Sequence, residues 1–184
     1  MRVFIAVLVL IFSLQSWTKA DDISDFEIEG MSIGDSALDY FSEKKILEGI
    51  KVNAKSYKQF KPKNKFGEIY STEANTYDQI SFFVKTDDPK YEIYLIRGMI
   101  RYDSNLDKCL EKKSNITKDI ENLFIDFKKR DYKVKSKLDS TGRSYTLRTV
   151  FSSKNVDYII VQCSHWEESF RKKNKLGAGI SVII

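Results

Sequence analysis

Histidine and cysteine, the usual zinc ligands, are scarce in this chain of 184 residues. It has one His and two Cys, whereas a structural zinc site takes four ligands, usually Cys and His. A phosphate-binding loop and a dinucleotide fingerprint both need several glycines at fixed spacing, and neither pattern occurs. We therefore expect no metal and no cofactor.

Long apolar runs are missing too. The longest covers residues 3–14 and is far shorter than the roughly 20 residues that a membrane-spanning helix needs. A positive charge at Arg2 precedes it, and small side chains follow at Thr18 and Ala20, the two positions that a signal peptidase reads. The pattern predicts a signal peptide at residues 1–20, cleaved after Ala20. An uncleaved membrane anchor is the alternative.

Acidic and basic residues nearly balance once this segment is removed. The segment carries two basic residues and no acid, so the formal net charge falls from +5 to +3 for residues 21–184. This size suits a single domain. We expect one periplasmic or secreted domain with no transmembrane segment and no nucleic-acid partner.

Alternating apolar and polar residues predict an antiparallel sheet. Turn-forming residues at 86–90, with Asp before Pro, and at 152–155 predict two hairpins. The expected strands are residues 26–31, 66–70, 77–85, 91–102, 144–151, 156–163 and 180–184.

One long amphipathic helix is expected at about residues 104–129. Apolar residues recur there at spacings of three and four, from Leu106 to Phe127, as is typical of a helix with one apolar face. Ser104 and Asp107 have the spacing of a capping box at its start.

Three shorter helices are also expected. Ser36 and Asp39 have capping-box spacing, with Leu38 and Phe41 on one face, and apolar residues within 46–50 follow Ser42. The capping-box spacing of Ser164 and Glu167 precedes a charged segment that ends at Lys173. Strands, one long helix and strands again predict an α+β fold in which the helix packs on one face of the sheet. No internal repeat is visible in the sequence.

The two cysteines are expected to form a disulfide, because pairs of cysteines in exported proteins become oxidised in the compartment to which the protein is exported. Cys109 lies on the apolar stripe of the predicted long helix, and Cys163 lies near the end of a predicted strand. Both can therefore face the contact between helix and sheet. Two buried free thiols are the alternative.

The single histidine restricts hydrolytic chemistry to one neighbourhood. A Ser-His-Asp or Cys-His arrangement must use His165. The candidate nucleophiles are Ser32, Ser36, Ser140 and Ser144, and the candidate orienting acids are Asp35 and Asp139. No serine lies in a nucleophile elbow, and packing by Trp166 at a predicted helix start explains the histidine. We expect no catalytic residue, and a small hydrolase using His165, Ser144 and Asp139 is the alternative.

A segment rich in lysine and aromatic residues is the candidate binding surface. Residues 51–65 are polar and long for a simple connection. Lysines attract an anionic partner, and aromatic rings hold one. A solvated loop is the alternative. The candidate binding residues are Tyr57, Lys58, Phe60, Lys61 and Lys63.

The N-terminal part of the expected domain resembles a group of known sequences. Asp25 to Ser36 reads Asp-Phe-Glu-Ile-Glu-Gly-Met-Ser-Ile-Gly-Asp-Ser, and Leu38 to Phe41 continue it. This stretch resembles the opening of small exported proteins of unknown function from AT-rich marine bacteria. The resemblance covers mainly residues 25–41, implies a periplasmic location and carries over no activity.

The function expected from these features is that of a non-enzymatic periplasmic binding or envelope-accessory domain. Its partner is expected to be an anionic envelope component or another exported protein. The alternatives are the small hydrolase and an inhibitor or immunity-type partner of another exported protein.

Overall fold

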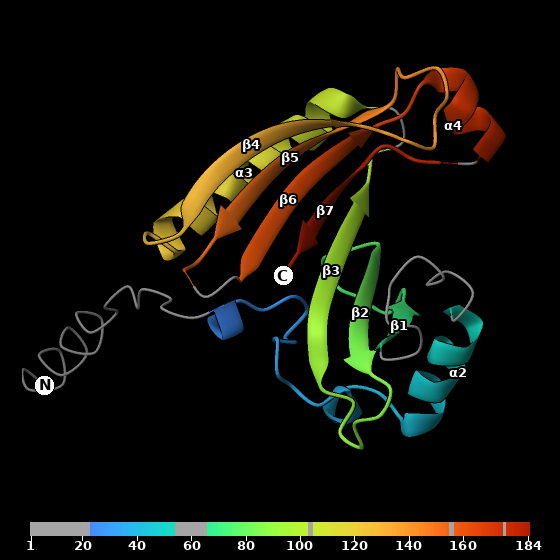
Figure 1. The fold of residues 1–184 in the computed structure, drawn as a ribbon, viewed down its shortest axis with the longest axis vertical. Coiled ribbons are helices and arrows are strands. Elements are labelled where there is room, and N and C mark those ends of the chain that lie inside the picture. The colour runs from blue at the N-terminus through green and yellow to red at the C-terminus, as the bar shows by residue number, and fades with distance from the viewer. Residues whose placement is uncertain (1–22, 54–65, 103–104, 155–156, 175) are drawn as a thin grey trace, which may run out of the picture.

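A computed structural model describes residues 23–53, 66–102, 105–154, 157–174 and 176–184 (Figure 1). Within these ranges, no helix combines the length and apolar character needed to cross a bilayer. The predicted signal peptide at residues 1–20 lies outside the described residues. So do the candidate binding residues Tyr57, Lys58, Phe60, Lys61 and Lys63.

The first part of the chain forms a helix followed by three antiparallel strands. Two short 3-10 helices, η1 (Ile23–Asp25) and η2 (Ala37–Asp39), precede α2 (Glu43–Asn53). The strands are β1 (Phe66–Ser71), β2 (Gln79–Lys85) and β3 (Ile93–Arg101). The turn at 86–90 joins β2 to β3, which pair antiparallel, so the first predicted hairpin is confirmed.

The second part repeats this order of elements, although the sequence shows no repeat. Helix α3 (Leu106–Leu123) is followed by three strands, and a short helix then leads to one more strand. These elements are β4 (Lys128–Lys135), β5 (Tyr145–Ser152), β6 (Tyr158–His165), α4 (Glu168–Asn174) and β7 (Gly179–Ile183). The second predicted hairpin, β5 to β6, is confirmed.

All seven strands belong to one antiparallel sheet, in the order β1-β2-β3-β7-β6-β5-β4. Strand β7 lies between β3 and β6 and pairs with both, so it joins the two groups of three strands (Figure 1). The predicted α+β class with an antiparallel sheet is therefore confirmed.

Two glycines let α2 approach β1 closely. A Cβ atom added at Gly67 in β1 would lie 2.4 Å from Cγ1 of Ile50 in α2, and one added at Gly49 would lie 3.0 Å from Cγ2 of Ile69. Contacts below 3 Å do not occur for real Cβ atoms. A larger residue at Gly67 would therefore push the helix away from the strand.

A disulfide joins α3 to β6, and α3 also contacts β7. The Cα atoms of Cys109 and Cys163 are 6.0 Å apart, and both residues are fully buried. The predicted disulfide is thus confirmed. Beside it, the ammonium group of Lys113 donates a hydrogen bond to the buried Thr149 hydroxyl and lies 3.8 Å from the Asp131 carboxylate.

The strand predicted at residues 26–31 is wrong, because the chain turns back on itself there. Ile28 and Met31 exchange backbone hydrogen bonds across Glu29 and Gly30, whose φ angles are 56° and 76°. The Glu29 carboxylate accepts hydrogen bonds from backbone amides of the loop before β2, at 2.6 Å from Thr76. The alternating residues therefore belong to a tight turn, and the polar side chain of Glu29 anchors this turn to the loop before β2.

The predicted helix at 104–129 is too long at its C-terminal end. Phe124 leaves the helical conformation at φ −114° and ψ 67°, and its buried side chain enters the core. Residues 128–135, of which the first two were assigned to the helix, form β4 instead. At the other end, the observed cap is Asn105, whose side chain accepts from the Lys108 amide at 3.0 Å.

The capping role predicted for Ser164 is wrong, because β6 continues through Ser164 to His165. His165 is consequently the last residue of a strand. The cap of α4 is Glu167, whose Oε2 accepts from the Phe170 amide at 2.9 Å. The strand ends two residues later than its pattern indicates, at His165 instead of residue 163, and the helix cap lies three residues later, at Glu167 instead of Ser164.

Candidate functional site

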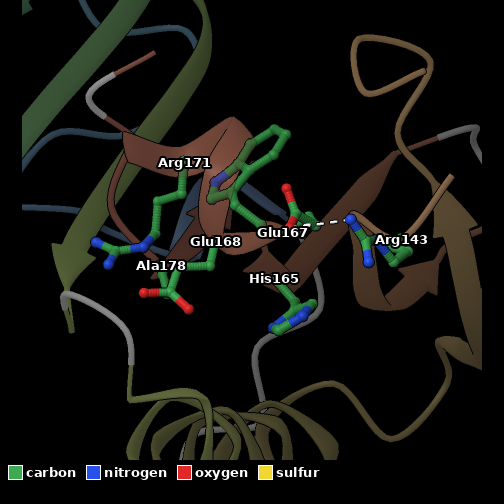
Figure 2. Close-up of a pocket in the computed structure, with 7 residues that line it drawn as sticks. Arg143, His165, Glu167, Glu168, Arg171 and Ala178 are labelled. Carbon is green, nitrogen blue, oxygen red and sulfur yellow. Dashed lines mark hydrogen bonds and ion pairs between the residues drawn. The ribbon is translucent and has the colours of Figure 1, made fainter. Parts of the chain in front are cut away.

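A pocket of about 440 Å³ opens where β6 ends and α4 begins (Figure 2). It combines two arginines and two glutamates with an indole and the only histidine of the chain. Its lining residues are Arg143, His165, Trp166, Glu167, Glu168, Arg171 and Ala178.

The Asp139 carboxylate holds the loop between β4 and β5 beside this pocket. It accepts hydrogen bonds from the amide and hydroxyl of Thr141, at 2.9 and 2.7 Å. It also accepts from the amide and hydroxyl of Ser144, at 2.9 and 2.7 Å. The hydrogen bond from the Ser144 hydroxyl is the largest cause that holds the pKa of Asp139 far below its ordinary value. Asp139 is therefore ionised in the folded protein at neutral pH.

Ser144 links this loop to the start of α4. Its buried Oγ accepts from the Glu167 amide at 2.9 Å while its proton goes to Asp139. The Glu167 carboxylate in turn pairs with Arg143 at 3.1 Å. A hydrogen bond from the Ser169 hydroxyl is the main cause that lowers the pKa of Glu167. Loop, strand end and helix are thus tied together by one set of hydrogen bonds.

His165 packs against Tyr145, its partner in the neighbouring strand, with ring centroids 4.7 Å apart. The Lys133 ammonium group lies 4.1 Å from the Tyr145 centroid on the far side of this row. Trp166, expected to pack on the histidine, instead stacks on Phe170 at 5.9 Å. His165 is therefore held by a strand pair rather than by a helix start.

Two of the three residues of the hydrolase alternative, His165, Ser144 and Asp139, meet in the structure. Ser144 and Asp139 are hydrogen-bonded directly, whereas no hydrogen bond in the described part of the chain joins His165 to either of them. In a Ser-His-Asp arrangement the histidine stands between the serine and the acid. The observed hydrogen bonds do not have that order, and they use Ser144 and Asp139 to anchor the loop.

Arg171 differs from the other charged residues of the pocket. Glu168 pairs with Lys172 at 2.7 Å, and this contact is the main cause that lowers the pKa of Glu168. Arg143 is paired with Glu167. The Arg171 guanidinium makes no ion pair with any residue that the structure describes. Figure 2 shows Arg171 and Arg143 on opposite sides of His165.

Arg143, Trp166 and Arg171 were not identified as site residues from the sequence. Arg143 follows the predicted turn at 139–142, and Arg171 lies in the predicted charged helix, so each had a local explanation as a solvated residue. Their convergence depends on the antiparallel pairing of β5 with β6, which brings the two segments together. No spacing in the sequence carries that information.

Aromatic residues also gather where the described chain resumes after the predicted binding segment. The Phe66 ring lies 5.4 Å from that of Tyr94, and the Lys85 ammonium group lies 4.3 Å from the Tyr94 centroid. Phe66 and Tyr94 are both exposed. The binding role of residues 57–63 itself stays a prediction.

The described residues contain no group of three or more His, Cys, Asp or Glu that could hold a metal ion. Comparison of the chain with protein-family models, with curated proteins and with solved structures finds no match in any of the three.

Proposed function

We propose that this chain is a non-enzymatic binding domain that acts in the periplasm or outside the cell as an envelope-accessory factor. The signal sequence expected at residues 1–20 and the resemblance at residues 25–41 support the location. The Cys109–Cys163 disulfide agrees with it, because disulfides persist in oxidising compartments.

In this proposal α3 covers one face of the sheet. Cys163 is bound to α3, and its neighbours across the sheet are Ile180 and Leu147. Because successive residues of a strand point to opposite faces, this row lies on the α3 side. The adjacent row, which includes Gln162 and Arg148, lies on the other side.

The observation that carries the binding function is the different use of charged groups in the pocket. Ser144, Asp139 and Glu167 are engaged in hydrogen bonds that anchor the backbone, so they are not free to transfer protons. Arg171 has no ion-pair partner within 4 Å among the described residues, although its charge adds to that of Lys172 in lowering the pKa of the Glu168 carboxyl. It lines the same pocket as Trp166 and His165. A guanidinium binds carboxylate or phosphate with two parallel hydrogen bonds.

The expected ligand is therefore an anionic group attached to an apolar or ring-shaped part. The anion binds Arg171, and the remainder rests against Trp166. Headgroups of envelope lipids and acidic sugars both have this chemistry. The pocket size, about 440 Å³, lies within the range of small-molecule sites.

Titration calorimetry with phenyl phosphate and with glucuronate, each an anion attached to a ring, tests this proposal. We expect at least one of them to bind, and Arg171→Gln to weaken binding by about tenfold or more, since a hydrogen bond to a charged group contributes about 1.5–3 kcal/mol. Lys173→Gln is the matched control, because Lys173 lies on the same helix without lining the pocket.

Three results bear on the alternatives. Binding that is equal in the Arg171→Gln and wild-type proteins contradicts the assigned site. Failure of both compounds to bind contradicts the anionic ligand. Turnover of an ester substrate that is lost in His165→Ala supports the hydrolase instead.

A further inference from the structure

Strand β4 forms one edge of the sheet and is exposed along its whole length. Its eight residues pair with β5 in continuous register from Lys128 to Lys135, with no bulge. The other side of an edge strand presents backbone N–H and C=O groups that no neighbouring strand uses. A long and regular edge of this kind has the geometry to accept one more strand.

The edge is strongly basic. β4 has five basic residues and one acid, Asp131, in a chain with a formal net charge of +5. Two of these charges are paired with residues of α3, Lys129 with Glu121 at 2.9 Å and Asp131 with Lys113 at 3.8 Å. The remaining four make no ion pair within the described ranges. They are Lys128, Arg130, Lys133 and Lys135.

We propose that β4 binds an extended acidic segment of another exported protein, which adds to the sheet as an antiparallel eighth strand. Backbone hydrogen bonds supply the affinity in this mode, and side chains supply the specificity. Opposite charges directly across a strand pair are stabilising. Acidic residues of the partner placed opposite Arg130 and Lys133 complete the interaction.

The charges disfavour a second copy of this chain as the added strand. Antiparallel pairing of β4 with itself, centred between Asp131 and Tyr132, places Arg130 opposite Lys133 and Lys128 opposite Lys135. Like charges facing each other across strands are destabilising. Homodimerisation through this edge is therefore disfavoured.

Protection of an edge against aggregation does not account for this much charge. Charged side chains, above all lysine, do protect edge strands. However, β1 at the other end of the sheet order has a single charged residue, Glu68, which is nearly buried and paired with Arg97 at 2.7 Å. Of the two edge strands, only β4 carries several basic side chains that make no ion pair with the described residues. The continuous register with β5 favours a peptide over an anionic polysaccharide, which needs charge but no regular backbone.

The test uses a fluorescein-labelled acidic octapeptide of Glu, Val and Thr, with binding followed by fluorescence polarisation at low salt. We expect Arg130→Glu/Lys133→Glu to weaken binding about tenfold or more, since close charge pairs at interfaces contribute at least this much. The control is Lys108→Glu/Lys118→Glu, the same charge change at exposed positions of α3, and we expect it to bind like wild type.

A second arm separates strand addition from simple charge attraction. The same peptide with N-methyl groups on all backbone amides keeps its charge but cannot pair as a strand, and we expect its binding to be lost. Hydrogen exchange measured by NMR should slow at alternate β4 amides when the unmodified peptide binds. Equal binding of the methylated peptide overturns the proposal. The proposal is also overturned if the wild-type protein binds neither peptide but binds heparin through Arg130 and Lys133.

Discussion

At the scale of single residues, Asp139 controls the loop beside the pocket. Its carboxylate accepts hydrogen bonds from Thr141 and Ser144. The Ser144 hydroxyl oxygen in turn accepts one from the Glu167 amide. Asp139 is only 3% exposed. A buried carboxylate is tolerated when its oxygens are hydrogen-bonded, as these are.

Replacing Asp139 with Asn should make the stability of the fold depend less on pH in the acidic range. The folded pKa of Asp139 lies below its ordinary value, which is about 4 in an unfolded chain. Its stabilising contribution is therefore complete above that pH and is lost as pH falls toward the folded pKa. We expect Asp139→Asn to lower Tm at pH 7, with the difference from wild type shrinking toward pH 2.

Circular dichroism melts between pH 7 and pH 2 provide the measurement. Asp87→Asn, in the exposed turn between β2 and β3, is the control for loss of a carboxylate elsewhere. A difference in Tm that stays constant over the whole range would show that Asp139 does not act through its charge.

At the scale of secondary-structure elements, the features that could be predicted are those that depend on residues close together in the sequence or on the position of a residue within one element. Both hairpins follow turn residues, and the disulfide follows from the places of Cys109 and Cys163 on predicted elements. β4 was missed because an edge strand exposed on both sides needs no apolar alternation. The pocket could not be predicted, because its residues come from separate segments that only strand pairing brings together.

The contact between α2 and β1 gives a prediction at this scale. We expect Gly67→Ala to lower the free energy of unfolding by about 1–3 kcal/mol, because overpacking forces side chains and backbone to shift. The added Cβ would meet Cγ1 of Ile50 at 2.4 Å. Gly177→Ala is the control, since nothing lies within 4 Å of a Cβ atom placed there.

Urea unfolding of a double mutant checks the cause. Ile50→Ala alone is also destabilising, but it removes the atoms that the new Cβ meets. We therefore expect Gly67→Ala/Ile50→Ala to lose less stability than the sum of the two single variants. Additive losses would place the effect of Gly67 in the strand backbone instead.

At the scale of the whole molecule, the disulfide connects positions 54 residues apart in sequence. Cross-linking a loop of this length restricts the unfolded chain and stabilises the folded state by about 4 kcal/mol. We expect Cys109→Ala/Cys163→Ala to lose roughly this free energy of unfolding, measured by urea denaturation without reductant. Wild-type protein in reductant should approach the same value, and equal stability of all three samples would contradict a structural role.

The central place of β7 has a consequence for the newly made chain. Synthesis proceeds from the N-terminus, so both groups of three strands can form while residues 179–183 are still missing. During that interval the inner edges of β3 and β6 have no partner, and unpaired strand edges promote aggregation in incompletely folded chains. The nascent protein therefore passes through a stage in which strands that end up inside the sheet still have an open edge, and a chaperone that shields β3 and β6 would be needed only until β7 arrives.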